Sequence, residues 1–427
     1  MSSIQEEAHA QEEEVDEKTT LLPVQTHVFK RRWYILFVFS LLSCTQNGLW
    51  STWGPISASA EEAFDWTDAD IALLSMWGPI SYIITAFILS WIVDVRGLRW
   101  ACLIMAFLVA LGSGIRCITD QPPYVKWTIN IGQFLNDLAG PCSAIPPLLS
   151  ATWFPANQRV TATAISVTIS NLGAALMDFI LECAWSVFVF LLLLIYFPAK
   201  PPKPPTVSAS IERDDFKSGV KNLVRNVKFW LICATYGVSV GVFSCWLSVL
   251  DVVLKPHGIS QKDTGWLSFY AVLAGCVGSV ILARTEQYIL ENMWHERGAN
   301  KRPSACYPTR YPNLYSTAVV TFYPLSALEV SLYIAIIVAT LLLNSAVPLY
   351  FEMACEVTYP VSEGITNFVL TLVKNAGGIL FLGLLMVPSL GTDWENWAAL
   401  GAIISCVPVL LLFKERFSRL DVDEVNR

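Results

Sequence analysis

Long uncharged runs of apolar residues recur along this chain and predict membrane-spanning helices. Roughly 18 such residues cross a bilayer as a helix, and five runs exceed that length, at 33–60, 71–93, 229–250, 264–283 and 330–351. The composition agrees, because 54% of the residues are hydrophobic and only 15% are charged, against roughly 25% charged residues in soluble proteins. The chain is therefore expected to be an all-α polytopic membrane protein.

Further apolar segments extend the expected number of spans. Four are clear, at 100–118, 127–149, 365–387 and 397–413. Residues 160–199 have room for two minimal helices or for one long tilted helix, and the polar stretch 286–312 leaves only a weak ninth span at 313–328. We therefore expect up to twelve helices, with spans five, six and nine shortened or incomplete, and ten or eleven helices otherwise.

Basic residues set the expected orientation, because Lys and Arg favour the cytosolic side of a membrane. Lys30, Arg31 and Arg32 precede the first span, whereas the next loop, 61–70, has acidic residues and no basic one. A segment rich in Pro, Lys and Arg separates two groups of spans. The expected order is a disordered cytosolic tail (1–29), an N-terminal transmembrane half (30–198), a cytosolic linker (199–228), a C-terminal transmembrane half (229–415) and a cytosolic tail (416–427).

Several classes of function find no support in the composition. The net charge of -7 comes largely from the acidic stretch 6–17, so no nucleic-acid partner is expected. The eleven cysteines are scattered singly and the four histidines are dispersed, so neither a metal site nor a cofactor is expected. Gly237–Gly241 matches the G-x-S-x-G pattern of hydrolases, but it lies inside an apolar helix and indicates close helix packing instead. The chain is not expected to be an enzyme.

The polar N-terminal tail carries a pattern that resembles an acidic dileucine sorting signal. Glu17 precedes the pair Leu21 and Leu22, with three residues between them, shortly before the first span. Clathrin adaptor complexes bind such signals on flexible cytosolic segments of endosomal and lysosomal membrane proteins. The alternative is chance, because patterns this short recur in unrelated sequences.

Polar residues within the apolar runs are candidates for a transport pathway, since ionisable groups inside a membrane are costly and commonly functional. Gln133 and Asn136 share a helix face at i, i+3, so their amides are candidate substrate contacts, with an interhelical hydrogen bond as the alternative. Asp251 ends one apolar run and is either a proton site or a solvated carboxylate at a helix end. Asp137 and Lys374 form a candidate buried ion pair.

Two segments are the most distinctive in the chain: Leu49-Trp50-Ser51-Thr52-Trp53-Gly54-Pro55-Ile56 and the late stretch 351–364, FEMACEVTYPVSEG. Together with motifs at 70–74, 77–80, 94–99, 132–136, 162–165, 241–243, 249–251 and 344–348, they resemble the major facilitator superfamily. Within it, the chain resembles solute carrier family 49, which includes the feline leukaemia virus subgroup C receptor relatives, and most of all a lysosomal member. The chain lacks most of the family's loop between spans five and six, and it is polar at 286–312, where the family has a strongly apolar ninth span.

This resemblance implies a fold of two pseudo-symmetric six-helix halves, with a central cavity that opens alternately to each side. It places Trp50 at a substrate-contacting aromatic position, for which packing or an interfacial anchor is the alternative. It places Asn375 at a substrate-facing amide position, and Tyr236 is a further candidate. The implied activity is the movement of a small molecule, pyridoxine (a form of vitamin B6), together with protons from an acidic lumen.

Two charged turns resemble the gate motifs of the superfamily. Asp94, Arg96 and Arg99 follow a span, and an acid at this position pairs with an Arg and caps a neighbouring helix. The second half carries a matching set of acidic residues, Glu352, Glu356 and Glu363. We expect both turns to close the cytosolic side, and a solvated positive-inside loop is the alternative.

The leading interpretation is a multi-pass secondary transporter in the lysosomal or endosomal membrane, with both termini in the cytosol. A second interpretation is a transporter of choline-like cations, as in relatives of the family, or of haem. A third class is a truncated membrane protein that does not transport, which the short region 160–199 and the polar region 286–312 favour.

Overall fold

The described part of the chain is a bundle of long helices without strands. The computed structural model describes residues 26–53, 56–121, 124–176, 182–206, 208–211, 213–254, 258–296, 329–385, 394–412 and 419. The dileucine segment and the weak ninth span at 313–328 lie outside these residues. Six helices in the described ranges are long and apolar enough to cross a membrane, namely Ala69–Arg96, Leu98–Arg116, Val227–Ser248, Gln261–Thr285, Tyr333–Thr358 and Glu363–Leu384.

The first group of helices spans residues 32 to 195. Its members are α2 (Arg32–Ser51), α3 (Ser57–Phe64), α4 (Asp68–Arg96), α5 (Leu98–Arg116), α6 (Tyr124–Asp137), η1 (Gly140–Ala144), α7 (Pro146–Trp153), η2 (Ala156–Gln158), α8 (Arg159–Leu176) and α9 (Glu182–Ile195). The stretch 160–199, which the sequence left open, therefore holds two helices. We call this group the N-terminal helices.

The second group, the C-terminal helices, follows from residue 216. It comprises α10 (Phe216–Arg225), α11 (Val227–Tyr236), η4 (Gly237–Gly241), α12 (Val242–Ser248), α13 (Leu250–Leu254), α14 (Gln261–Glu296), α16 (Glu329–Thr358), α17 (Glu363–Leu385) and α18 (Trp394–Leu412). The helix α14 continues past its apolar run into the polar region that begins at residue 286.

Three apolar runs do not form single helices, and the local sequence gives the reason. The first run ends as α2 at Ser51, just before Gly54 and Pro55, and resumes as α3. The run 127–149 is divided into α6, η1 and α7, where prolines at 141, 146 and 147 lack the backbone N–H that a continuous helix needs. The run 229–250 contains the π-helical turn η4, bounded by Gly237 and Gly241.

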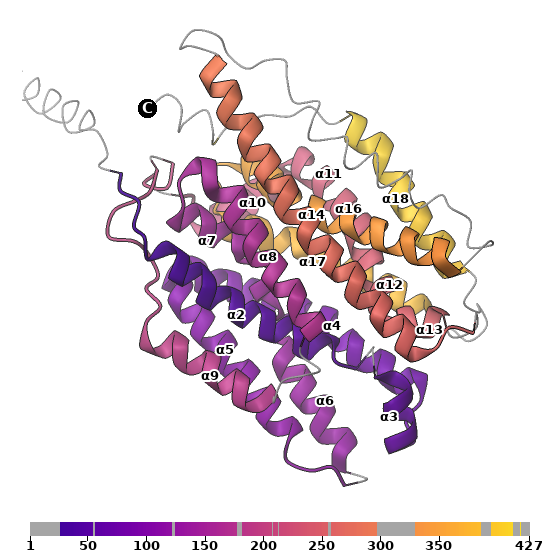
Figure 1. Ribbon diagram of the computed structural model, residues 1–427. Coiled ribbons are helices and arrows are strands. Elements are labelled where there is room, and N and C mark those ends of the chain that lie inside the picture. The colour runs from indigo at the N-terminus through magenta and orange to yellow at the C-terminus, as the bar shows by residue number, and fades with distance from the viewer. Residues whose placement is uncertain are drawn as a thin grey trace, which may run out of the picture.

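Two clusters of buried side chains hold the bundle together. One lies within the N-terminal helices and includes Phe39, Met105 and Trp153, joined by Phe368 of α17. The other lies mainly within the C-terminal helices and includes Phe229 and Tyr350. The two groups meet where α4 packs against α17 and α8 packs against α14 (Figure 1). The Tyr82 hydroxyl on α4 donates a hydrogen bond across this contact to the Phe368 carbonyl, at 3.2 Å.

Glycines allow several helices to approach until their backbones touch. A Cβ atom added to Gly173 of α8 would lie 2.0 Å from the Cys44 carbonyl oxygen of α2. A Cβ on Gly241 would lie 2.4 Å from the Lys374 carbonyl oxygen of α17, and one on Gly377 would lie 2.5 Å from that of Gly237. The interpretation of Gly237–Gly241 as a site of close helix packing is therefore confirmed.

We expect Gly173→Ala to destabilise the protein, because the new methyl group would force α2 and α8 apart. Overpacking of this kind costs about 1–3 kcal/mol. Gly114→Ala on α5 is the matched control, since nothing lies within 4 Å of its Cβ position, and alanine is the better helix former by about 1 kcal/mol. Thermal unfolding of the purified variants measures both effects. A melting temperature of Gly173→Ala equal to that of Gly114→Ala would contradict the close contact.

Candidate functional site

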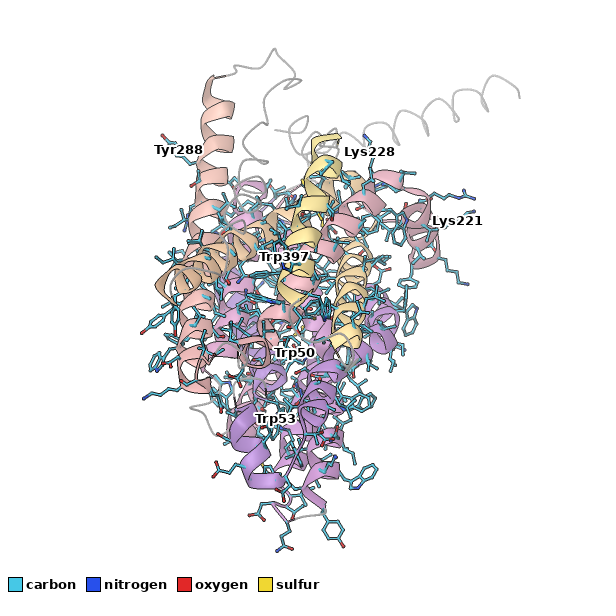
Figure 2. All side chains as sticks on the ribbon, turned by 90° about the vertical axis from the view of Figure 1, so that its right-hand side faces the viewer. Trp50, Trp53, Lys221, Lys228, Tyr288 and Trp397 are labelled. Carbon is cyan, nitrogen blue, oxygen red and sulfur yellow. The ribbon has the colours of Figure 1, made fainter. Side chains whose placement is uncertain are left out.

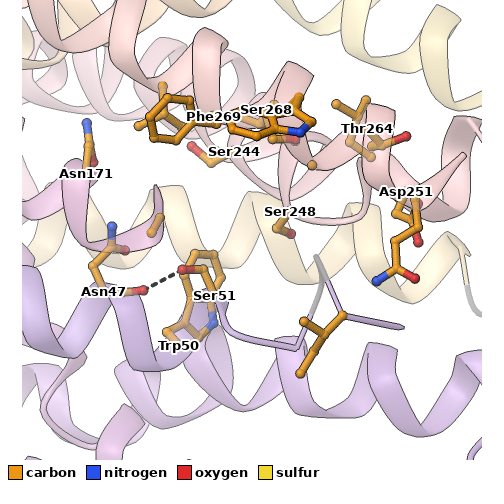
Figure 3. Close-up of a pocket in the computed structure, with 18 of the residues that line it drawn as sticks. Asn47, Trp50, Ser51, Asn171, Ser244, Ser248, Asp251, Thr264, Ser268 and Phe269 are labelled. Atoms are coloured by element: carbon orange, nitrogen blue, oxygen red, sulfur yellow. Dashed lines mark hydrogen bonds between the residues drawn. The ribbon is translucent and has the colours of Figure 1, made fainter. Parts of the chain in front are cut away.

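A cavity of about 910 Å³ opens between the two groups of helices. The N-terminal helices contribute Asn47, Trp50 and Ser51 of α2 and Asn171 of α8, whereas α12, α13, α14, α16 and α17 supply most of the remaining wall (Figure 3). Its volume suits a small organic molecule, since ligand cavities measure roughly 300–1,000 Å³. Most of the wall is apolar, with amide, hydroxyl and charged groups at separate points.

Trp50 is held rigidly in the cavity wall. Its indole Nε1–H donates a hydrogen bond to the Ser75 carbonyl of α4, at 3.2 Å. Gly78 of α4 provides the space for the ring, because a Cβ at that position would lie 2.2 Å from Nε1. The polar edge of the indole is thus satisfied by protein, and Trp50 lies between Lys228 and Trp53 along the bundle (Figure 2). Such a ring offers a flat apolar surface to a ligand.

Gln133 and Asn136 are fully buried behind this wall. Their amides donate to the two carboxylate oxygens of Asp137, at 3.3 and 3.1 Å, and also to backbone carbonyls of α2. The carbonyl that Gln133 reaches belongs to Trp50, at 3.4 Å. The two amides therefore make the interhelical hydrogen bonds that the sequence left as the alternative, and neither side chain lines the cavity.

Tyr236 and Asn375 also lie outside the cavity wall. Tyr236 is buried against Tyr350 and Phe351 of α16, with ring centroids 5.1 and 5.9 Å away. The Asn375 amide donates to the Thr371 carbonyl of its own helix, at 2.8 Å. Its neighbour Lys374 lines the cavity instead.

Among the described residues, three charged ones line the cavity, and all three lie on the C-terminal helices: Asp251, Lys262 and Lys374. Asp251 belongs to the short helix α13, and Figure 3 shows it on the side of the cavity away from Asn47 and Asn171. The ion pairs of the described residues do not include one between Asp137 and Lys374. That hypothesis was wrong, because Asp137 is bonded by two amides of its own helix.

A second site gathers the three late glutamates at one end of the bundle. Glu352 and Glu356 of α16 and Glu363 of α17 all bind the guanidinium of Arg419, whose side chain is 1% exposed. The Glu356 and Glu363 contacts measure 3.2 and 3.4 Å, and the Arg419 backbone N–H adds a bond to Glu356 at 3.0 Å. We call this set the carboxylate cluster.

The linker between the two groups of helices also reaches the carboxylate cluster. Arg213 approaches Glu363 at 2.5 Å and lies over the Tyr359 ring at 4.8 Å. Sequence reasoning missed both arginines as partners, because the chain separates them from the glutamates. The only signal in the sequence was that the linker and the segment after the last span contain basic residues.

The first charged turn lies next to α17. Asp94 at the end of α4 is a neighbour of Ser362, which precedes α17. A Cβ on Gly364 would lie 3.5 Å from Val93, so the end of α4 touches the start of α17. Arg96 is exposed and Arg99 is half-buried. The structure therefore brings Asp94 to the second half, while the glutamates bind Arg213 and Arg419.

Within the described ranges, no group of three or more His, Cys, Asp or Glu side chains could hold a metal ion.

The comparisons with known proteins identify the family. The profile of the Major Facilitator Superfamily matches residues 36–382. The chain belongs to this superfamily. Two solved structures share its fold: the proton:xylose symporter XylE (TM-score 0.65, 12% identity, 92% of this chain and 99% of that one) and the E. coli fucose:proton symporter FucP (0.61, 12%, 90% and 100%).

Sequence relatives narrow the assignment to solute carrier family 49. The Solute carrier family 49 member 4 homolog of Xenopus tropicalis is 34% identical, over 94% of this chain and 95% of its own length. The Choline/ethanolamine transporter FLVCR1 of Mus musculus is 26% identical, over 90% of this chain and 74% of its own. This chain is therefore a membrane transporter of solute carrier family 49 and not an enzyme.

We expect Arg419→Gln to destabilise the folded state strongly, because it leaves three buried carboxylates without their shared cation. Removing one partner from a buried ion pair costs about 3–5 kcal/mol. The matched control is Lys221→Gln, which removes an exposed positive charge of α10 (Figure 2). Thermal unfolding in detergent measures both variants, and an equal melting temperature for the two would rule out the buried cluster.

Glu395, in the first turn of α18, predicts a pH dependence of stability. The side chain is buried, and neither carboxylate oxygen has a hydrogen-bond partner among the described residues. Burial raises the pKa of this carboxyl from 4.5 to about 7. Between these values the folded state binds more protons than the unfolded state, so stability falls as the pH rises through this window.

The melting temperature should therefore be higher at about pH 5 than at about pH 7.5, and Glu395→Gln should reduce this difference. Glu62→Gln, which changes an exposed carboxylate, should leave the difference as it is. Thermal unfolding at both pH values is the measurement. An identical pH dependence in wild type and Glu395→Gln would show that this carboxyl is not buried in its neutral form.

Proposed function

We propose that this transporter moves pyridoxine, a small organic solute, across an endolysosomal membrane together with protons. The observation that carries the proposal is the cavity between the N-terminal and C-terminal helices, with the Trp50 ring fixed in its wall. Helices that share a central cavity can separate at one end and close at the other, which exposes the site to each side in turn.

In this proposal each candidate residue has a role that fits its place. Trp50 stacks against the pyridine ring, and Gln133 supports it from behind through the Trp50 carbonyl. Asn136 acts with Gln133 by holding Asp137. Asp251, which lines the cavity, takes up the coupled proton. Tyr236 acts indirectly, by packing behind the cavity wall. Asn375 also acts indirectly, through its neighbour Lys374.

The charged turns form the cytosolic gate in the same scheme. Asp94, Arg96 and Arg99 act at the end of α4, and Glu352, Glu356 and Glu363 act with Arg419 and Arg213. Charge pairs that must break in each cycle set the relative populations of the two states.

The proposed arrangement has the two transmembrane halves at 30–198 and 229–415, with cytosolic termini. Glu17, Leu21 and Leu22 would direct the protein to lysosomes through clathrin adaptors.

A second candidate is the transport of a choline-like cation. The printed name of the FLVCR1 relative states choline and ethanolamine as its substrates. Aromatic faces bind quaternary ammonium ions through cation–π attraction, and Trp50, Phe243, Trp266 and Phe269 line the cavity. Competition between the two substrates separates the candidates.

The test is the uptake of labelled pyridoxine by cells that carry the chain at the plasma membrane, with Leu21 and Leu22 changed to alanine. We expect uptake to be larger at acidic than at neutral outside pH, because protons then drive entry. Trp50→Ala should reduce it about tenfold or more, the loss expected when an aromatic contact of about 1.5 kcal/mol disappears. Trp397→Ala is the matched control, since that ring is 74% exposed and does not line the cavity.

Each outcome decides between the candidates once surface expression is established. Labelled choline taken up in place of pyridoxine would replace the first proposal by the second. If the cells take up neither solute, the result favours the third interpretation, a truncated membrane protein that does not transport. Pyridoxine uptake without a pH effect would keep the substrate and remove the proton coupling.

A further inference from the structure

Lys374 places a positive charge at the middle of a membrane-spanning helix. It is the twelfth of the 23 residues of α17, which runs from Glu363 to Leu385. A lysine at this depth is costly unless it faces a partner or a water-filled path. Here it faces the cavity, together with Trp50 of the opposite group of helices.

The backbone around Lys374 is fixed by the close contact with η4. A Cβ on Gly241 would lie 2.4 Å from the Lys374 carbonyl oxygen, and one on Gly237 would lie 2.9 Å from that of Val373. This segment of α17 therefore cannot move toward η4, and the lysine side chain is presented from a rigid position. The buried thiol of Cys245 on α12 is one of its neighbours.

No carboxylate forms an ion pair with Lys374 among the described residues. The arginines show the contrast, since Arg116, Arg213 and Arg419 each bind a glutamate. The other charged residues that line the cavity among the described residues are Asp251 of α13 and the exposed Lys262 at the start of α14. The residues of the N-terminal helices that are described in the structure contribute no charged side chain to this wall.

We propose that Lys374 binds an acidic oxygen of the substrate, so that the site takes planar ring compounds with an ionisable hydroxyl or a carboxylate and rejects quaternary ammonium ions. This inference rests on the proposed function, because it assigns a substrate class to the same cavity. An ammonium group has three hydrogen-bond donors and a compact charge, and a charge-assisted hydrogen bond is strong where water is excluded. In this arrangement the aromatic face of Trp50 contacts the substrate ring, and the Lys374 ammonium group binds the acidic oxygen of the substrate.

The same charge opposes a choline-like occupant. A positive charge nearby repels a quaternary ammonium ion and so opposes the cation–π attraction that would hold it. The aromatic residues of this cavity are therefore insufficient to make it a choline site. The charge of Lys374 distinguishes between two solutes that an aromatic wall alone would accept equally.

The test measures binding to the purified full chain in detergent, by ligand-induced thermal stabilisation. The probes are three rings of similar size, which are 3-hydroxypyridine, pyridine and the N-methylpyridinium ion, together with pyridoxine and choline. We expect 3-hydroxypyridine to bind about tenfold or more tightly than pyridine, the size of one charge-assisted hydrogen bond. N-methylpyridinium and choline should bind most weakly.

Three variants test the origin of this order. Lys374→Met keeps the length of the side chain without its charge, and it should abolish the preference for 3-hydroxypyridine and strengthen the binding of N-methylpyridinium. Lys374→Arg should retain the preference. Lys221→Met is the matched control, because it removes an exposed lysine of α10 that does not line the cavity, and it should leave the order unchanged.

Two results of the binding measurements would overturn the proposal. One is that the wild-type protein binds N-methylpyridinium as tightly as 3-hydroxypyridine. This measurement does not depend on the folding of any variant. The other is an unchanged order in Lys374→Met. Failure of the proposed function looks different: the order of binding holds, but cells expressing the chain take up no pyridoxine. If wild type and Lys374→Met take up pyridoxine equally well, the transport function stands and the role of Lys374 is wrong.

Discussion

The architecture depends on close contact between helix backbones, which glycine makes possible at a few positions. Gly173 lets α8 rest on the Cys44 carbonyl of α2, and Gly237 and Gly241 do the same for η4 and α17. Gly78 has a related role, because it leaves room for the Trp50 indole against α4. A bilayer supplies little hydrophobic force between helices, so association depends on close packing and on polar contacts. These backbone contacts make the cavity wall rigid.

Charge is distributed unequally between the two sites. In the carboxylate cluster, Glu352, Glu356 and Glu363 are matched by Arg419, with Arg213 beside them. A compensated cluster of this kind can hold two helices in one arrangement and release them when its partners separate. In the cavity, by contrast, Lys374 has no carboxylate in an ion pair with it among the described residues. Compensated charge suits a gate, whereas an uncompensated charge suits the recognition of a ligand.

The shared fold limits what the solved neighbours teach about substrates. XylE and FucP match this chain along most of its length at only 12% identity, so they establish the arrangement of helices and nothing about the solute. In a transporter of this fold the solute is chosen by the few side chains that line the cavity. Trp50, Asp251 and Lys374 line that cavity, and the proposed roles in substrate and proton binding rest on them.

The sequence by itself determined the class of the protein, because long uncharged runs have few outcomes other than membrane helices. It also indicated the helix contact at Gly237–Gly241. The roles that it predicted for Trp50 and the three glutamates stay predictions. Only the tertiary structure decided which polar residues share a site. Gln133 and Asn136 occupy one helix face, as their spacing requires, but that face meets backbone carbonyls of α2 and not the cavity. Arg419 reaches glutamates more than fifty residues away in the chain, and such a contact leaves no local pattern. Local spacing fixes which residues share a helix face, whereas the packing of distant helices fixes what that face meets.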